Sequence, residues 1–344
     1  MKFSEAFDAF LKARAAEGIR PNTLHAYRAD RRKFLEYVGD IDPIKAKPRQ
    51  GYSEGGLTAA HFDTAFAALH EAGYANGTIN IFQSTMRAFT KWLRERGMLL
   101  PDQNPLGGRK WLRDPPKPRK RLSTGQVKEL LKADLHPRDK ALIATGIFLF
   151  LRQSEAATLR ISDVDLEANR IRVTVHKTKD TDIMIIPVEL RPILRDWLTY
   201  YTNNAGPLQP DWYLLPAKEG FVFDREPSLR PTKKMDKIAT IVNRALDQIG
   251  FPTKDEKGHP TREGMHTLRR SSALNLYYEL TEQGVDQALM TCKSFLHHSS
   301  VTTTERYLGL ESGREARNRD FEDKPLFPSL SDDNVTYLGD RRAL

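Results

Sequence analysis

The chain has 344 residues, of which 54 are Lys or Arg and 45 are Asp or Glu, so its formal net charge is +9. That length suits two domains, each able to bury its own core. With 39% hydrophobic and 29% charged residues, the composition excludes a chain that is disordered throughout and argues against a membrane protein. The positive charge favours a polyanionic partner such as DNA or RNA.

The single cysteine, Cys292, excludes an internal disulfide and a cysteine-based zinc site. The longest strongly apolar run, residues 147–151, is too short to cross a bilayer. The opening residues MKFSEAFDAFLKA carry acidic side chains where a signal peptide would have an unbroken apolar core. We therefore expect a cytoplasmic protein in a reducing environment.

The first hundred residues predict four helices, because their apolar residues recur at helical spacing. The expected ranges are 3–18, 21–38, 58–73 and 78–96, with Ile81 on the inner face of the last. Residues 43–56, rich in Pro, Gly and charge, predict a loop.

Residues 109–121 hold seven basic residues and three prolines. This segment is either a solvated linker or a linker lying along a phosphate backbone, and its cations favour the second interpretation.

The second half predicts mainly helices with one strand-rich interruption. Ser123 and Gln126 indicate a helix cap, and an apolar helix at 140–151 is expected to end at Arg152. Two strands are expected at 171–175 and 183–188, joined by a polar hairpin tip. Further helices are expected at 190–201, 231–249, 266–281, 285–296 and 301–308.

Breaking a phosphodiester bond without a metal ion needs a nucleophile, a proton donor for the leaving oxygen, and cations that hold the charge on the non-bridging oxygens. Arginine suits the last task because its planar guanidinium contacts two phosphate oxygens and stays charged. Candidates occur at four places: Arg152 with Glu155, Lys177 and Lys179, His266 with Arg269, and His298 with Tyr307.

Each candidate also has an ordinary structural explanation. A helix-end arginine is favoured by the helix dipole, hairpin lysines promote solubility, and a tyrosine often packs half-buried in a core. His297 and His298 could be cap residues or a metal pair. No cysteine cluster or HExxH motif completes a metal site, so we expect no bound metal.

Taken in order, however, Arg152, a hairpin lysine, the His266-x-x-Arg269 box, His298 and Tyr307 resemble the tyrosine recombinase (phage integrase) family. The resemblance implies that Tyr307 is the nucleophile and that the arginines and histidines of the set are catalytic, with Glu155 supporting them. Lys179 matches the hairpin lysine because it lies eight residues before Pro187, and Lys177 remains the alternative.

The implied fold is mainly α. It combines a four-helix core-binding (SAM-like) DNA-binding domain at 1–108 with an α-rich catalytic domain containing a small antiparallel sheet at 123–310. Residues 109–122 form the linker, and the tail at 311–344 is expected to pack against a neighbouring protomer. Since the chain starts directly with the core-binding helices, we expect no arm-binding domain, as in Xer or Cre recombinases and unlike the lambda kind.

The implied activity is site-specific DNA recombination through a 3′-phosphotyrosyl intermediate, without metal or cofactor. The expected partners are double-stranded DNA with a roughly inverted-repeat site and three further copies of the chain in a tetramer. An accessory DNA-bending protein would be compatible with this assembly, and the enzyme is expected at the nucleoid in the cytoplasm. The residues predicted to contact DNA are Arg28, Arg31, Arg32, Lys117, Arg119, Lys120, Arg121 and Lys177.

Three features depart from the family pattern. His297 stands where glycine is usual, Arg270 where histidine is frequent, and the 43–56 loop is longer than typical. None removes a catalytic group, so we expect an active enzyme. The alternatives are a type IB topoisomerase, which shares this chemistry, a DNA-binding regulator that has lost catalysis, and a metal-dependent nuclease.

Overall fold

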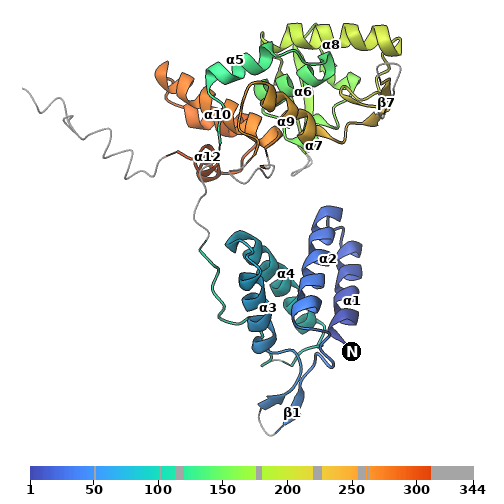
Figure 1. Cartoon of the computed structure of the whole chain (residues 1–344), viewed down its shortest axis with the longest axis vertical. Coiled ribbons are helices and arrows are strands. Elements are labelled where there is room, and N and C mark those ends of the chain that lie inside the picture. The colour runs from blue at the N-terminus through green and yellow to red at the C-terminus, as the bar shows by residue number, and fades with distance from the viewer. Residues whose placement is uncertain are drawn as a thin grey trace, which may run out of the picture. The chain divides into compact units, whose positions relative to one another are not determined.

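The computed structural model divides the chain into two compact units, Met1–Pro118 and Arg119–Leu344 (Figure 1). It describes residues 1–49, 52–100, 102–113, 120–175, 180–219, 227–254, 261 and 263–310. The boundary between the units falls within the predicted linker. Among the described residues, no helix has both the length and the apolar character needed to span a membrane.

The first unit contains the four predicted helices. They are α1 (Phe3–Ala16), α2 (Pro21–Tyr37), α3 (Ala59–Glu71) and α4 (Asn76–Glu95). Pro21 is the first residue of α2, where its missing N–H costs nothing, and Thr58 caps α3 in a capping box. These local signals explain why the helix starts were predictable.

Phenylalanines form the centre of this unit. Phe89 of α4 contacts three rings of α1, with centroid distances of 4.5 Å to Phe7, 5.2 Å to Phe3 and 5.5 Å to Phe10. Phe3 also stacks on Phe34 of α2 at 4.0 Å. All five side chains are fully buried. One aromatic cluster therefore joins the first, second and fourth helices.

The prediction of a loop at 43–56 is wrong in part, because the segment contains a short antiparallel hairpin of β1 (Lys47–Arg49) and β2 (Tyr52–Glu54). The buried side chain of Gln103 holds the base of the hairpin, donating hydrogen bonds to the carbonyls of Ile44 and Leu57. Gly56 follows at φ +75°, where an added Cβ would lie 2.5 Å from the backbone nitrogen of Ala46. These long-range contacts explain why local composition did not reveal the hairpin.

The second unit is largely helical, as predicted. Its helices are α5 (Thr124–Lys132), α6 (Pro137–Phe148), α7 (Gln153–Ala156), a 3-10 turn (Ile161–Asp163), α8 (Leu190–Ala205), α9 (Ile238–Gln248), α10 (Met265–Glu282), α11 (Ala288–Phe295) and α12 (Val301–Leu308). The strands are β3 (Val164–Asp165), β4 (Arg170–Val175), β5 (Asp180–Ile185), β6 (Pro216–Lys218) and β7 (Leu229–Lys234).

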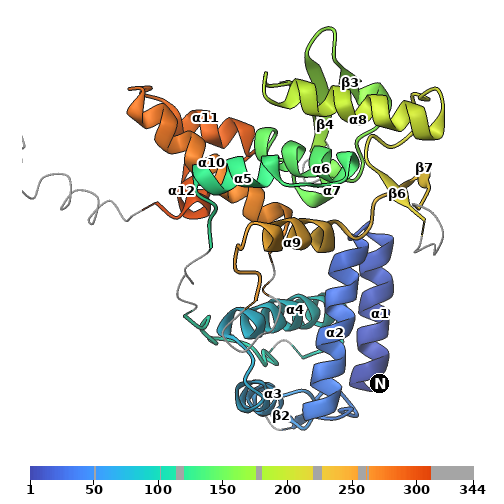
Figure 2. The same ribbon diagram turned by 45° about the horizontal axis from the view of Figure 1, so that its top comes forward.

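Strands β3, β4 and β5 form an antiparallel sheet, seen beside α8 in Figure 2. Its register pairs Ile171 of β4 with Met184 of β5, and these two side chains face the core. The second strand starts earlier than predicted, at Asp180. The helix predicted at 231–249 is wrong in its first part: residues 229–234 pair with β6, and the helix begins only at Ile238.

The interior of the second unit depends on close contact between α6 and α10. Gly146 of α6 permits it, since an added Cβ there would lie 2.8 Å from Cε of Met265 and 3.3 Å from a methyl group of Leu268. A smaller cluster beyond α10 joins Phe150, Cys292, Leu296 and Leu308. This second cluster seats α11 and α12 against α10.

The aromatic cluster of the first unit yields a stability prediction. Phe89→Ala should lower the free energy of unfolding by about 3–5 kcal/mol, because it leaves a cavity among three rings. Ile81 on the same helix was predicted to be buried but is 59% exposed, since it points away from this cluster. Ile81→Ala is therefore a matched control and should change stability little. Urea unfolding of both variants measures the difference, and equal losses would contradict the assignment of the core.

Candidate active site

The prediction that Arg152 ends an apolar helix is wrong, because Arg152 instead precedes a helix as its N-cap. Helix α6 stops at Phe148, and Phe150 then adopts a left-handed conformation at φ +51°. Arg152 follows as the extended N-cap of α7 and donates its backbone N–H to Oε2 of Glu155 at 2.7 Å. Its guanidinium binds Oε1 of the same carboxylate at 2.8 Å. Glu155 therefore both caps α7 and orients the guanidinium of Arg152.

Arg269 of α10 reaches the same point from another part of the chain. Its side chain is 1% exposed, and it donates hydrogen bonds to the carbonyls of Phe150 and Leu296. It also lies 3.6 Å from Oε2 of Glu155, whose side chain is equally buried. Arg152 donates to the carbonyl of Leu296 at 3.3 Å. The two arginines thus share one carboxylate and one carbonyl.

The charge balance of this cluster favours an anion. Two guanidinium groups face one buried carboxylate, which leaves an excess of positive charge where the dielectric constant is low. Burial and the neighbouring Arg152 lower the pKa of Arg269 to about 10. Arg269 therefore stays charged at neutral pH, and an additional anion would reduce the repulsion between the two cations.

His266 lies one turn before Arg269 on α10, as the spacing predicted. Desolvation lowers the pKa of His266 below its ordinary value of 6.5, and the positive charges of Arg269 and Arg152 lower it further. The ring is consequently neutral at pH 7 and retains a nitrogen that can accept a hydrogen bond or a proton.

His298 and Tyr307 come together across the turn between α11 and α12. Nδ1 of His298 is 3.1 Å from the hydroxyl of Thr304, which orients the ring. The rings of His298 and Tyr307 meet edge to face with centroids 5.2 Å apart. The hydroxyl of Tyr307 donates to the carbonyl of His266 at 3.4 Å, so the tyrosine reaches the start of α10.

The pKa of Tyr307 reflects two opposing effects. Burial raises the pKa of the hydroxyl above its ordinary value, whereas the positive charges of Arg269, Arg270 and Arg152 lower it. The hydroxyl is therefore protonated at neutral pH, while the nearby guanidinium groups would stabilise its anion. This is a suitable environment for a hydroxyl that reacts as a nucleophile only when its proton leaves.

The structure thus brings together Arg152, Glu155, His266, Arg269, His298 and Tyr307. Lys177 and Lys179 lie outside the described residues, so their prediction stands as made. The sequence analysis missed Thr304 and the carbonyl of Leu296, which hold His298 and both arginines in place. A main-chain acceptor carries no sequence signal, and Thr304 was indistinguishable from its threonine neighbours.

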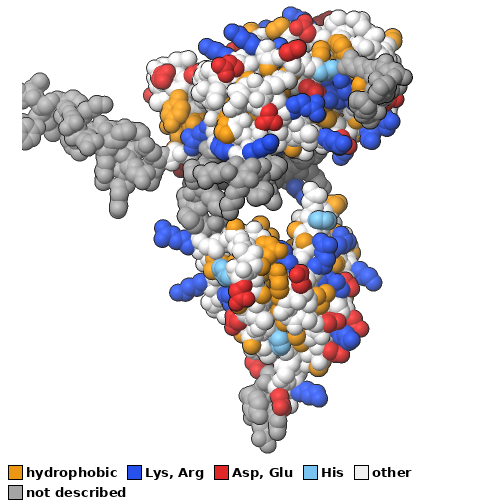
Figure 3. All heavy atoms as spheres, viewed as in Figure 1, with side chains coloured by type: hydrophobic (Ala, Val, Ile, Leu, Met, Phe, Trp, Pro, Cys, Tyr) orange, Lys and Arg blue, Asp and Glu red, His pale blue; other side chains and the backbone are white. Residues whose placement is uncertain are grey.

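The residues predicted to contact DNA have differing environments. Arg28, Arg31 and Arg32 line a hollow of about 340 Å³ between α1 and α2, where Arg31 also pairs with Asp8 at 3.0 Å. On the face of the first unit drawn in Figure 3, Lys and Arg gather over these two helices, with acidic side chains among them. Lys117 and Arg119 lie outside the described residues.

Two linker cations bind within the second unit. Lys120 donates to the carbonyl of Pro252 at 2.7 Å, and Arg121 donates to that of Gly309 at 3.3 Å. Both bonds use main-chain carbonyls, so they neutralise neither positive charge. The C-terminal end of the basic segment is therefore bound to the second unit.

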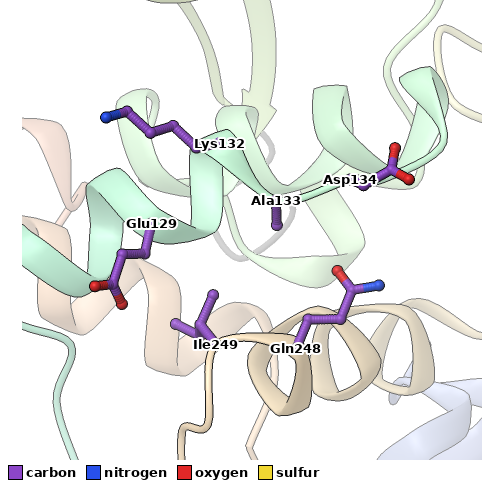
Figure 4. Close-up of a pocket in the computed structure, with 6 residues that line it drawn as sticks. All are labelled: Glu129, Lys132, Ala133, Asp134, Gln248 and Ile249. Atoms are coloured by element: carbon purple, nitrogen blue, oxygen red, sulfur yellow. The ribbon is translucent and has the colours of Figure 1, made fainter.

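A larger hollow lies away from this cluster. It has a volume of about 590 Å³ between the ends of α5 and α9, lined among others by Lys132, Asp134 and Gln248 (Figure 4). It contains none of the predicted site residues. Within the described ranges, no three His, Cys, Asp or Glu side chains group closely enough to hold a metal ion.

Comparison with known proteins places the chain in a family. The model of the phage integrase family matches residues 120–313, which is more than half of the chain. Tyrosine recombinase XerA of Thermococcus kodakarensis is 27% identical over 314 residues, covering 88% of this chain and 89% of XerA. Tyrosine recombinase XerC of Pseudomonas syringae pv. tomato is 26% identical, covering 88% and 91% of the two chains.

The fold also has solved counterparts. The crystal structure of a lambda integrase (75–356) dimer bound to a COC′ core site superposes with a TM-score of 0.67 at 14% identity, covering 91% of this chain and 98% of that one. The chain belongs to the phage integrase family. It is a tyrosine recombinase of the Xer type, an enzyme of site-specific DNA recombination, and the comparisons favour neither the topoisomerase nor the regulator.

The shared carboxylate yields a second prediction. Glu155→Gln keeps the size of the side chain but leaves Arg152 and Arg269 without a compensating charge. Breaking a buried pair in this way should lower the stability of the second unit by about 3 kcal/mol. Thermal unfolding measures the loss.

Glu129→Gln is a matched control, because that carboxylate is exposed on α5 and lines the hollow that contains no site residue. A Glu155→Gln variant as stable as wild type would show that the carboxylate does not balance the arginines.

Proposed function

We propose that this recombinase cleaves and rejoins DNA through Tyr307. The observation that carries the proposal is the convergence of two charged arginines on one buried carboxylate beside a tyrosine hydroxyl. The phenolic oxygen attacks the scissile phosphorus, a P–O(Tyr307) bond forms, and the bond from phosphorus to the 5′-oxygen breaks. The 5′-hydroxyl of a partner strand then reverses the step, so the energy of the phosphodiester bond is retained without cofactor or metal.

The surrounding residues divide the remaining tasks. Arg152, Arg269 and His298 hold the charge of the pentacoordinate phosphate, with Glu155 fixing the arginines. His266 assists removal of the phenolic proton. Its lowered pKa supports this assignment as a base, because the ring is neutral at pH 7. Lys179 of the β4–β5 hairpin delivers a proton to the departing 5′-oxygen, with Lys177 as the alternative.

The domain roles follow the same proposal. Residues 1–108 form the core-binding domain that clamps the duplex, with Arg28, Arg31 and Arg32 on its DNA-facing side. Lys117, Arg119, Lys120 and Arg121 of the linker contact the phosphate backbone, and residues 123–310 catalyse strand transfer. The DNA-bound state of the lambda and Tn1549 integrase structures supports a duplex partner. An enzyme acting on chromosomal or plasmid DNA would work at the nucleoid in the cytoplasm.

Covalent trapping tests the chemistry. With a duplex nicked near the cleavage point and EDTA present, wild-type enzyme should form an adduct that survives denaturing electrophoresis. Tyr307→Phe should form none while still retarding the duplex. Arg152→Ala should slow adduct formation by about 10²–10³-fold, because one preorganised transition-state donor is lost. An adduct from the Tyr307→Phe variant would overturn the assignment of the nucleophile, and loss of the adduct with EDTA would favour a metal-dependent nuclease.

The proposed assembly is a tetramer, because exchange of two duplexes needs four active sites. Residues 311–344 then pack against a neighbouring protomer. A chain ending at Leu310 should bind a single half-site with unchanged affinity but lose cooperative occupancy of the full inverted repeat. Native gel titration of both duplexes measures the two quantities. Unchanged cooperativity in the shortened chain would refute a role for the tail, and a synapse with two protomers would refute the tetramer.

A further inference from the structure

His297 occupies a backbone conformation that L residues rarely adopt. Its φ is +48°, in the left-handed region where glycine is favoured. Its backbone N–H nevertheless bonds the carbonyl of Ser294 at 2.9 Å, closing the turn that follows α11. The turn thus forms with a strained residue at a place where glycine would be relaxed. Such strain persists only where the surrounding structure holds the residue in place.

The imidazole of His297 forms a hydrogen bond that leads to another element. Nε2 lies 2.8 Å from Oδ2 of Asp182 on β5. The side chain of His297 is 14% exposed, whereas that of Asp182 is 47% exposed. The second ring nitrogen, Nδ1, is buried without a hydrogen-bond partner among the described residues. The contact with Asp182 is therefore the polar interaction that offsets burial of this imidazole.

The bond between His297 and Asp182 joins two segments that the proposed function uses. Leu296, which precedes His297, supplies the carbonyl that anchors both arginines, and His298 follows. Asp182 sits two residues from the start of β5 and pairs with Val173 of β4. The bond consequently joins the β4–β5 hairpin to the turn that aligns the arginines and His298.

We propose that His297 and Asp182 are positioning residues. Their bond holds the β4–β5 hairpin against the turn that follows α11, so that proton delivery to the leaving 5′-oxygen is efficient. This inference rests on the proposed function, in which the hairpin supplies the proton. A glycine at position 297 would form the turn without strain but could not make the link. The histidine instead contributes a side chain that ties the turn to a strand of the sheet.

The test separates proton delivery from the other steps of cleavage. In a duplex with sulfur replacing the bridging 5′-oxygen, the leaving group departs as a thiolate and needs no proton, because a thiol is far more acidic than an alcohol. Single-turnover adduct formation is measured on this phosphorothiolate duplex and on the ordinary one. A defect confined to the ordinary duplex identifies impaired proton delivery.

The variants are His297→Gly, Asp182→Ala and the double variant. Each should cleave the ordinary duplex about tenfold more slowly, which is part of the 10²–10⁴-fold typical of general acid catalysis. Each should cleave the phosphorothiolate duplex within about twofold of wild type. The double variant should be no slower than either single one, because both remove the same bond.

Two further variants exclude a merely structural effect. Asp180→Ala removes a carboxylate from the same face of β5 and should cleave both duplexes like wild type, since the bond from His297 goes to Asp182. His297→Asn should recover part of the rate, because asparagine tolerates the left-handed conformation and its amide can donate to Asp182. A defect in the Asp180→Ala variant as large as that in Asp182→Ala would overturn the proposal.

The remaining outcomes are also decisive. Equal slowing of His297→Gly and Asp182→Ala on both duplexes would overturn the inference, because the link would then act on the phosphate-binding groups. Wild-type rates on the ordinary duplex would overturn it too. An adduct formed by Tyr307→Phe, or none formed by wild type on either duplex, would instead overturn the proposed function and the inference resting on it.

Discussion

The site depends on one buried carboxylate. Glu155 accepts hydrogen bonds from the backbone and guanidinium of Arg152 and lies 3.6 Å from Arg269. Without it, two cations would repel each other in a medium of low dielectric constant. With it, the cluster keeps a net positive charge, which favours an additional anion. The buried carboxylate thus allows two like charges to lie side by side in the interior.

The second unit is arranged around this charge cluster. The left-handed residues Phe150 and His297 flank it, and the carbonyls of Phe150 and Leu296 point at Arg269. The contact of α6 with α10 across Gly146 sets the distance between the segments that carry the arginines. The cluster of Phe150, Cys292, Leu296 and Leu308 then seats α12, which carries Tyr307. Apolar packing therefore determines the position of Tyr307.

Much of the fold could be predicted locally. Pro21 and Thr58 marked helix starts, and Ser123 with Gln126 formed the expected capping box. Two of the failures share a cause. The hairpin within 43–56 is held by a distant glutamine, residues 229–234 pair with β6 instead of extending α9, and Ile81 has helical spacing but points outward. For the hairpin and for residues 229–234 a partner far along the chain decided the outcome, and no local pattern carries that information.

The sequence by itself determined which residues are candidates for the site, because the types and order of Arg152, His266, Arg269, His298 and Tyr307 are those expected for phosphoryl transfer to a tyrosine. Only the tertiary structure decided how they are held. It assigned Glu155 to both arginines, Thr304 to His298, and the link from His297 to Asp182. The reason is physical: residue types define which bonds can form, whereas burial and the approach of distant segments select the bonds that do form.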